Sequence, residues 1–190
     1  MKRFLTLFLA ASAAFAMGAV PENRFPLPQI QQNRSLGEGA GRWHRTLIPH
    51  AVTAKLTVGK DGTLEISRKG KPGVSSWRIN LTELPAGFYT VDTVVTGSAK
   101  AIIDIYVFDA QGKAKLVYLK RLTKAAGTQL CGTFEVPEGT VKVRFGFGVE
   151  DDGNASYKMP RLFRGLLAPE TLPPRDGASH ARKTPKDQLP

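Results

Sequence analysis

The chain has 190 residues, of which 42% are apolar, and it carries 27 Lys and Arg against 16 Asp and Glu, a formal charge of +11. This length and apolar content predict a single globular core with flanking tails. The lone cysteine, Cys131, excludes an intramolecular disulfide, so the domain must be stabilised by packing.

Residues 1–16 have the pattern of a secretory signal peptide. Lys2 and Arg3 precede an apolar run over 4–15, and small residues at Ala14 and Ala16 predict cleavage after Ala16. The run is shorter than the roughly 20 residues that a membrane-spanning helix needs, and no later segment reaches that length. We therefore expect a secreted or periplasmic protein with no membrane span; the alternative is an uncleaved signal that anchors the chain.

Three segments follow the signal peptide. Residues 17–41 are rich in Pro, Gln, Asn and Gly, which predicts an irregular N-terminal segment. Residues 42–166 contain short runs of Val, Ile, Thr, Phe and Tyr between turn residues, which predict an all-β fold, an antiparallel β-sandwich. Residues 167–190 are basic and rich in Pro with few apolar side chains, so we expect a disordered tail.

Alternation of apolar residues assigns faces within the predicted sandwich, because successive side chains of a strand point to opposite faces. Asp-Gly and Asp-x-x-Gly patterns at 59–62 and 109–112 predict hairpin turns. The residues expected to face the core are Tyr89, Val91, Thr93, Val95, Ala101, Ile103, Ile105, Val107, Val141, Val143, Phe145, Phe147 and Val149.

Trp77 is followed by LPAGFYTVDTVVTG at 84–97, AIIDIYVFDAQGK at 101–113 and TFEVPEGTVKVRFGFG at 133–148. With this order and spacing, roughly residues 43–165 resemble carbohydrate-binding modules of the galactose-binding-like jelly-roll type. The resemblance implies a jelly-roll fold and a non-catalytic module that stacks a glycan on aromatic side chains of its concave face. Jelly rolls of this pattern also serve as spacer or protein-contact domains.

The resemblance places binding aromatic residues at Trp77 and at Tyr106, in the middle of a concave-face strand. The alternation of the strands would add Asp92, Asp104 and Arg144 to the face of Tyr106, which would supply acceptors and a bidentate donor for sugar hydroxyls. In the alternative interpretation, Trp77 plugs one end of the core and the charged residues form an internal ion pair.

The expected ligand is a polysaccharide or oligosaccharide, and the basic charge allows it to be acidic. Export and the absence of a recognition motif disfavour nucleic acid, and nothing in the pattern selects an oligomeric state. A basic cluster fits either a patch for an acidic polymer or solvated side chains on an exposed strand. Its members are Lys113, Lys115, Lys120, Arg121 and Lys124.

No cofactor is expected. Many modules of this type hold a structural calcium ion through an Asp-containing last strand, whereas the matching stretch here, 155–160, has no acidic residue. Glu38 and the acidic cluster 150–152 could still supply oxygen ligands. The stretch 151–154 is better explained as a hairpin turn.

Three functions of different classes remain open. The first is a secreted carbohydrate-binding module, and the second is a structural or adhesion sandwich of the cell envelope with no glycan ligand. The third is a glycoside-active enzyme, for which Asp92 and Asp104 are the carboxylate pair to consider. We expect no enzymatic activity, because the three histidines are scattered and no nucleophile elbow or phosphate-binding glycine loop is present.

Overall fold

The computed structural model of the chain describes residues 22–25, 43–48, 53–59, 61–70, 72–82 and 84–175. The predicted signal peptide and residues 176–190 lie outside the described residues. The described residues form the strands β1 (Trp43–Ile48), β2 (Thr53–Val58), β3 (Leu64–Lys69), β4 (Val74–Leu81), β5 (Gly87–Gly97), β6 (Ala101–Phe108), β7 (Ala114–Leu122), β8 (Ala126–Val136), β9 (Lys142–Val149) and β10 (Gly153–Arg164), and the short 3₁₀ helix η1 (Pro169–Thr171).

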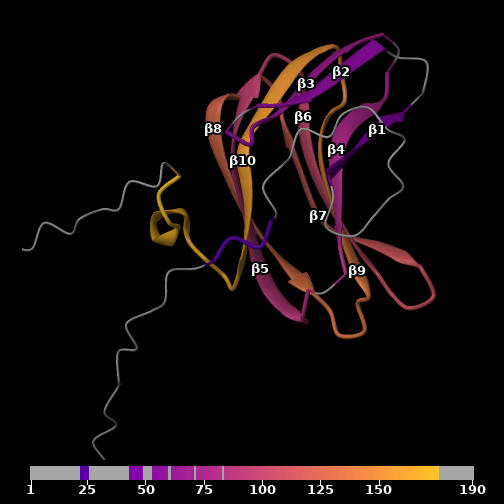
Figure 1. Cartoon of the computed structure of the whole chain (residues 1–190), viewed down its shortest axis with the longest axis vertical. Helices are drawn as coiled ribbons and strands as arrows, with labels where there is room; N and C mark the ends of the chain where they lie inside the picture. The colour runs from indigo at the N-terminus through magenta and orange to yellow at the C-terminus, as the bar shows by residue number, and fades with distance from the viewer. Residues whose placement is uncertain are drawn as a thin grey trace, which may run out of the picture.

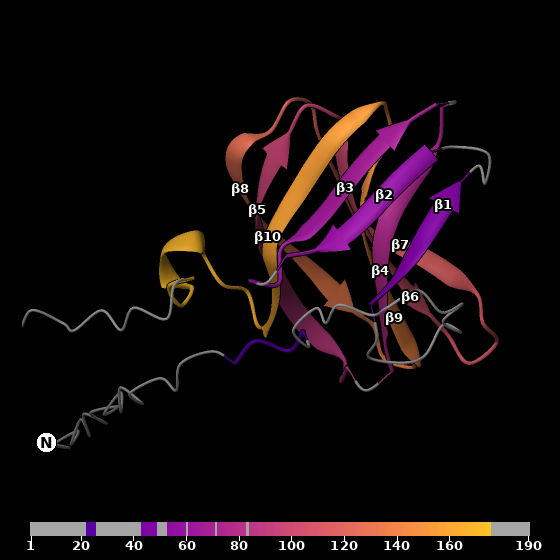
Figure 2. The same cartoon turned by 45° about the horizontal axis from the view of Figure 1, so that its top comes forward.

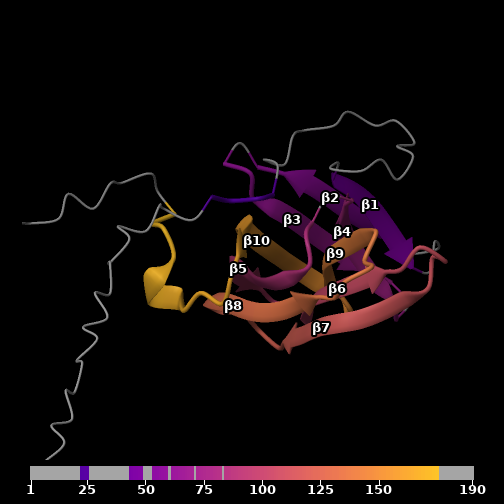
Figure 3. The same cartoon turned by 90° about the horizontal axis from the view of Figure 1, so that it is seen from below.

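The strands form two antiparallel sheets that pack face to face (Figures 1 and 2). Sheet A has the order β1-β4-β9-β6-β7, and sheet B has the order β2-β3-β10-β5-β8. Figure 3 shows the two layers from below, with the segment around η1 lying beside sheet B. The predicted all-β antiparallel sandwich is confirmed.

Two of the three hairpins that the sequence predicts are present. Strands β2 and β3 pair around the turn at 59–62, where the Gly59 amide donates to the Thr63 carbonyl oxygen at 2.8 Å. Strands β6 and β7 pair around the turn at 109–112, where the Gly112 amide donates to the Asp109 carbonyl oxygen at 3.0 Å. Local turn chemistry was sufficient to predict these two features.

The connection after β9 is different from the prediction. The sequence predicts a hairpin turn at 151–154, and this is wrong, because β9 belongs to sheet A and β10 to sheet B. The chain crosses between the layers here. Beside the crossing, the Glu150 carboxylate pairs with Lys100 at 2.9 Å and with Arg121 at 2.8 Å.

The core lies between the two sheets and is built by the predicted alternation. Strands β6 and β9 pair in register, so Ile103 lies beside Phe147 and Ile105 beside Phe145, all of them buried. Val141 is the exception: it is 47% exposed because β9 begins only at Lys142. The remaining predicted core residues that are buried are Tyr89, Val91, Thr93, Val95, Ala101, Val107, Val143 and Val149.

The N-terminal segment contributes to this core. The Phe25 side chain is only 5% exposed, and its ring centroid lies 4.8 Å from that of Phe145 and 5.6 Å from that of Trp43. Its backbone is held on β10, where the Arg24 amide donates to the Leu162 carbonyl oxygen at 2.7 Å. Residues 22–25 therefore pack as part of the folded domain, and they have no helix or strand, as expected of the irregular segment.

The first part of the predicted tail is also placed against the domain. Thr90 of β5 donates its hydroxyl to the Gly165 carbonyl oxygen at 2.7 Å and accepts the Leu167 amide at 2.9 Å. Further along, the Pro173 carbonyl oxygen accepts a hydrogen bond from Arg161 at 2.5 Å. Residues 167–175 thus differ from the disorder expected of them, because side chains of sheet B satisfy their backbone groups. We call residues 166–175 the C-terminal strap.

Candidate functional site

The candidate site is the outer face of sheet A, the side of that sheet that points away from the core. Strand register places three rows of side chains across it, because residues that pair in neighbouring strands share a face. The central row is His44, Arg78, Gly146, Asp104 and Leu119; the rows on either side are Thr46, Ser76, Gly148, Ile102 and Arg121, and Asn80, Arg144, Tyr106 and Leu116.

Asp104 is the acidic residue at the centre of this face. It is 7% exposed, and its carboxylate lies over Gly146, where an added Cβ atom would come within 2.6 Å of Oδ1. Burial raises the pKa of Asp104 above its ordinary value, although the positive charges of Arg78 and Arg144 oppose that shift. Because position 146 has no side chain, the carboxylate can lie flat against the sheet.

Several buried polar atoms of this face make no hydrogen bond within the described part of the chain. They are Oδ1 of Asp104, Oδ1 of Asn80, Oγ of Ser76 and Nε of Arg144. Asn80 is 3% exposed and Ser76 is fully buried. Leaving a buried polar group unpaired costs free energy, and native proteins keep few of them. Such atoms call for a partner, which can be ordered water or a ligand, so this face is a candidate binding site.

Two basic side chains of β9 lie over two aromatic rings of β6. The guanidinium carbon of Arg144 is 4.8 Å from the ring centroid of Tyr106 and 5.1 Å from that of Phe108. The Lys142 ammonium is 4.2 Å from the ring centroid of Phe108. These are cation–π distances, so the rings hold the two cations in place on the outer face.

Exposed leucines of β7 complete the face at its edge. Leu116 pairs with Tyr106, and Leu119 pairs with Asp104. The two leucines are 42% and 39% exposed, so they offer apolar surface directly beside the polar centre. Apolar surface next to convergent polar groups is the usual composition of a small-ligand or sugar site.

The predicted site residues are only partly brought together. Asp104, Tyr106 and Arg144 share the outer face of sheet A, as the alternation predicts. Trp77 does not: it points into the core, is 5% exposed, and donates its indole N–H to the Glu65 carbonyl oxygen at 3.2 Å. The prediction that Trp77 stacks on a glycan is therefore replaced by the alternative interpretation, in which it fills the core.

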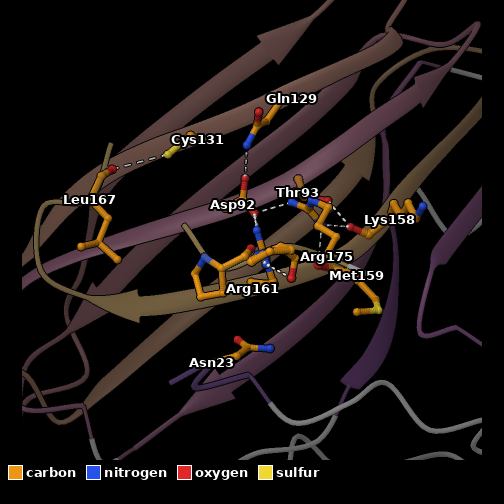
Figure 4. A network of polar contacts seen from close by, with 12 residues as sticks. Asn23, Asp92, Thr93, Gln129, Cys131, Lys158, Met159, Arg161, Leu167 and Arg175 are labelled. Carbon is orange, nitrogen blue, oxygen red and sulfur yellow. Dashed lines mark hydrogen bonds and ion pairs between the residues drawn. The ribbon is translucent and has the colours of Figure 1, made fainter. Parts of the chain in front are cut away.

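Asp92 lies on the opposite side of the molecule. It belongs to β5 of sheet B and points outward, so the prediction that it shares a face with Asp104 is wrong. Figure 4 shows its contacts: its Oδ2 accepts Arg161 Nη2 at 2.6 Å and also accepts Arg175 of the C-terminal strap, and Gln129 donates to its Oδ1 at 3.1 Å. Asp92 is fully buried by this cover and serves as an internal ion-pair centre.

Sequence reasoning missed Asn80 and Ser76, because β4 was not recognised as a strand. A signal for it exists in residues 74–81, where Trp77 and Ile79 alternate with polar residues at a period of two. Phe108 and Lys142 follow the alternation of β6 and β9 to the outer face, but the sequence does not mark them as site residues, since their contact depends on the pairing of β6 with β9.

The basic cluster at 113–124 contributes little to this face. All five of its members are exposed, and they lie on or beside β7, the edge strand of sheet A. Lys115 and Lys120 pair with the inward-facing Val107 and Ile103, so they do not share the outer face. Arg121 does share it, and it is paired with Glu150.

Among the described residues, no group of three or more His, Cys, Asp or Glu side chains is placed to hold a metal ion. Glu38, one of the candidate calcium ligands, lies outside the described residues. Cys131 is partly buried, burial raises the pKa of its thiol, and its sulfur lies 3.7 Å from the Leu167 carbonyl oxygen. None of the helices in the described ranges has the length and apolar character needed to cross a membrane.

No protein-family model matches the sequence, and no curated protein matches it. Solved structures are similar in fold. The CBM22-1 xylan-binding domain of a Paenibacillus barcinonensis protein is 12% identical, with a TM-score of 0.48 over 69% of this chain and 92% of that one. A putative sugar-binding protein of Bacteroides thetaiotaomicron is 12% identical, with a TM-score of 0.49 over 67% and 89%.

A third similar structure comprises the CBM22-1 and GH10 modules of an endo-1,4-β-D-xylanase from Clostridium thermocellum, complexed with xylohexaose. It is 9% identical, with a TM-score of 0.49, and the match covers 66% of this chain but only 26% of that one. These are similarities of fold, to proteins that include carbohydrate-binding modules of the kind that the sequence motifs resemble.

Proposed function

We propose that this protein is exported and binds a glycan, without catalysis, on the outer face of sheet A. The observation that carries the proposal is the set of buried acceptors on that face: Oδ1 of Asp104 and Oδ1 of Asn80 accept no hydrogen bond within the described residues. Export is supported by the signal-peptide pattern of residues 1–16.

The chemistry of these acceptors fits a sugar. Each hydroxyl of a sugar ring can donate a hydrogen bond. Asp104 on β6 and Asn80 on β4 are separated by β9, so hydroxyls on different rings of an oligosaccharide can satisfy the two acceptors. Hydrogen bonds to an ionised carboxylate are the stronger kind. The exposed side chains of Leu116 and Leu119 lie where the apolar C–H groups of the ring can rest.

A binding role is favoured over a catalytic one by the position of the carboxylates. Asp92 and Asp104 point outward from opposite sheets, whereas a glycosidase pair must flank one bond at a separation of about 5–9.5 Å. Asp92 is also enclosed by Arg161, Arg175 and Gln129. The two carboxylates therefore cannot act on one glycosidic bond.

The test is glycan-array binding by the purified mature chain, compared with Asp104→Asn and Asn80→Ala. We expect a restricted set of glycans to be retained by the native protein and lost by both variants. Thr57→Ala is the matched control, since Thr57 lies on the outer surface of sheet B and donates its hydroxyl to Glu65 at 2.7 Å.

Two outcomes would contradict the proposal. Retention that survives both substitutions would show that the glycan binds elsewhere. No retention of any glycan at high protein concentration would favour the structural or adhesion role instead. Product release from a polysaccharide panel incubated with the same protein would restore the enzyme hypothesis.

A further inference from the structure

The aromatic rings of the outer face are not left open as stacking platforms. Arg144 lies over both Tyr106 and Phe108, and Lys142 lies over Phe108. Phe108 is itself 9% exposed. A ligand that approaches these rings along β9 therefore meets the two cations first.

The two cations of β9 form no direct ion pair among the described residues, although the charge of Arg144 also acts on Asp104. None of the ion pairs found there involves Lys142 or Arg144. Arg121, in contrast, is held by Glu150 on the same face. The Nε atom of Arg144 is buried and makes no hydrogen bond within the described residues. This end of the face therefore has positive charge that is held in position by the rings and is not engaged in a direct ion pair.

The face thus has two kinds of binding group in adjacent rows. Asp104 and Asn80 require hydrogen-bond donors, as sugar hydroxyls are. Arg144 and Lys142 require an anion, and the planar guanidinium fork of arginine matches a carboxylate. Asn80 and Arg144 are direct neighbours in register, so one short ligand can reach both kinds of group.

We infer that the site selects glycans that carry carboxylates, with sugar hydroxyls bound by Asp104 and Asn80 and a uronate carboxylate bound by Arg144 and Lys142. This inference rests on the proposed glycan-binding function and names its substrate class. The rings of Tyr106 and Phe108 act as positioning residues that hold the cations.

The experiment is calorimetric titration of the mature chain with oligouronates, each compared with its carboxyl-reduced, neutral counterpart of the same linkage. We expect the uronate to bind at least about tenfold more tightly, the size of one charge-assisted hydrogen bond. The difference should shrink as salt is added, because partly exposed charges are screened.

Substitutions distinguish the contribution of the two cations to binding from that of the aromatic rings. Arg144→Gln and Lys142→Gln should each weaken uronate binding by about tenfold and weaken binding of the reduced glycan by a clearly smaller factor, so that the preference for the uronate falls. Lys55→Gln is the matched control, since Lys55 is an exposed cation of β2 in sheet B. Tyr106→Leu should weaken uronate binding selectively; selective loss of the neutral glycan would instead show that the ring itself stacks on sugar.

The outcomes distinguish this inference from the function on which it rests. Equal affinity for the uronate and its reduced counterpart, lost with Asp104→Asn, would overturn carboxylate selection and leave glycan binding intact. No binding of either ligand would overturn both. Equal binding of dextran sulfate and oligouronate, weakened as much by Lys55→Gln as by Arg144→Gln, would show general attraction of polyanions and would overturn the assigned site.

Discussion

The ring of Phe25 packs edge-on against the ring of Phe145, with the two centroids 4.8 Å apart and the planes at 89°. Phe145 is fully buried in the centre of β9, so a residue from the N-terminal segment reaches the middle of the core. The backbone beside it is tied to β10, where Asn23 Oδ1 accepts the Leu162 amide at 2.8 Å. The folded domain therefore starts before its first strand.

We expect Phe25→Ala to destabilise the domain by about 3–5 kcal/mol, the usual cost of removing a buried phenylalanine ring. Chemical denaturation of the mature chain measures this. Phe25→Leu should recover part of the loss because it refills part of the cavity. Glu22→Ala is the control, since Glu22 is exposed, and it should change stability by less than about 0.5 kcal/mol. Equal stability of Phe25→Ala and native protein would show that the segment is not part of the core.

The C-terminal strap should be released when Arg175 is replaced. Asp92 is fully buried and accepts hydrogen bonds from both Arg161 and Arg175. We expect Arg175→Ala to detach residues 166–175 and to speed tryptic cleavage after the exposed Arg164, followed by mass spectrometry.

Arg161 should matter more than Arg175 for global stability, because it makes two hydrogen bonds to Asp92 from within β10, at 2.6 and 2.9 Å. Replacing Arg161 should lower the free energy of unfolding by about 3–5 kcal/mol, the range for breaking a buried ion pair.

The Arg175→Lys variant should be cleaved by trypsin after Arg164 at an intermediate rate, since lysine keeps the charge but not the planar fork. A cleavage rate unchanged in Arg175→Ala would contradict the role of the ion pair in holding the strap.

Asp104 should make the domain less stable as the pH rises. Burial raises its pKa, so the folded state binds the proton more tightly than the unfolded chain does. Ionisation of Asp104 therefore lowers the free energy of unfolding. The loss begins as the pH rises above the ordinary pKa of aspartate, and it reaches its full size above the raised pKa. We expect Asp104→Asn to raise Tm at neutral pH by a few degrees, since about 1 kcal/mol shifts Tm by roughly 2–4 °C in a domain of this size. The difference should vanish in acid.

Asp61 supplies a control of opposite sign for that thermal-melting series. The backbone amide of Thr63 donates to Asp61 Oδ1 at 3.1 Å and its hydroxyl donates to Oδ2 at 2.9 Å. Both hydrogen bonds lower the pKa of Asp61, and the bond from the amide has the larger effect. Its stabilisation is present above the ordinary pKa of aspartate and is lost as the pH falls through the lowered value. Asp61→Asn should therefore lower Tm at neutral pH, whereas a Tm rise in both variants would mean that the titration argument fails.

The sequence predicts which side of its own sheet a residue occupies better than it predicts which sheet the strand joins. Ile103 and Phe145 were assigned to the core correctly, because alternation within one strand is enough to place them. Asp92 and Asp104 were placed together wrongly, because β5 pairs with β8 and β10 whereas β6 pairs with β7 and β9. Strand partners distant in sequence leave no local signal.

Trp77 shows a second limit. Its position in the sequence motif fits either a binding residue or a core residue, and only the burial between the sheets decides between them. Arg175 shows a third limit. A Pro-rich, basic stretch predicts disorder by composition, yet an ion pair with Asp92 and hydrogen bonds to its backbone place it against sheet B. Such contacts with distant strands are invisible to arguments from composition.

Gly146 and Gly148 provide a paired test of the candidate site. A Cβ atom at Gly146 would come within 2.6 and 2.8 Å of the two carboxylate oxygens of Asp104, the movable end of a side chain. A Cβ atom at Gly148 would come within 2.8 Å of Ser76 Cβ and 2.9 Å of the Ser75 carbonyl oxygen, which cannot move without displacing β4.

We therefore expect Gly146→Ala to weaken glycan binding by about tenfold, because it displaces the Asp104 carboxylate that would hold the sugar hydroxyls. Its Tm should stay close to that of the native protein. Gly148→Ala should lower Tm more, since the added methyl group overpacks against the backbone of β4. Glycan retention and thermal melting, measured on both variants, test the expected loss of binding in Gly146→Ala and the expected loss of stability in Gly148→Ala. If Gly146→Ala binds as the native protein does, the orientation of Asp104 is not what the ligand requires, and the acceptors of the site must be sought at Asn80 and Ser76 instead.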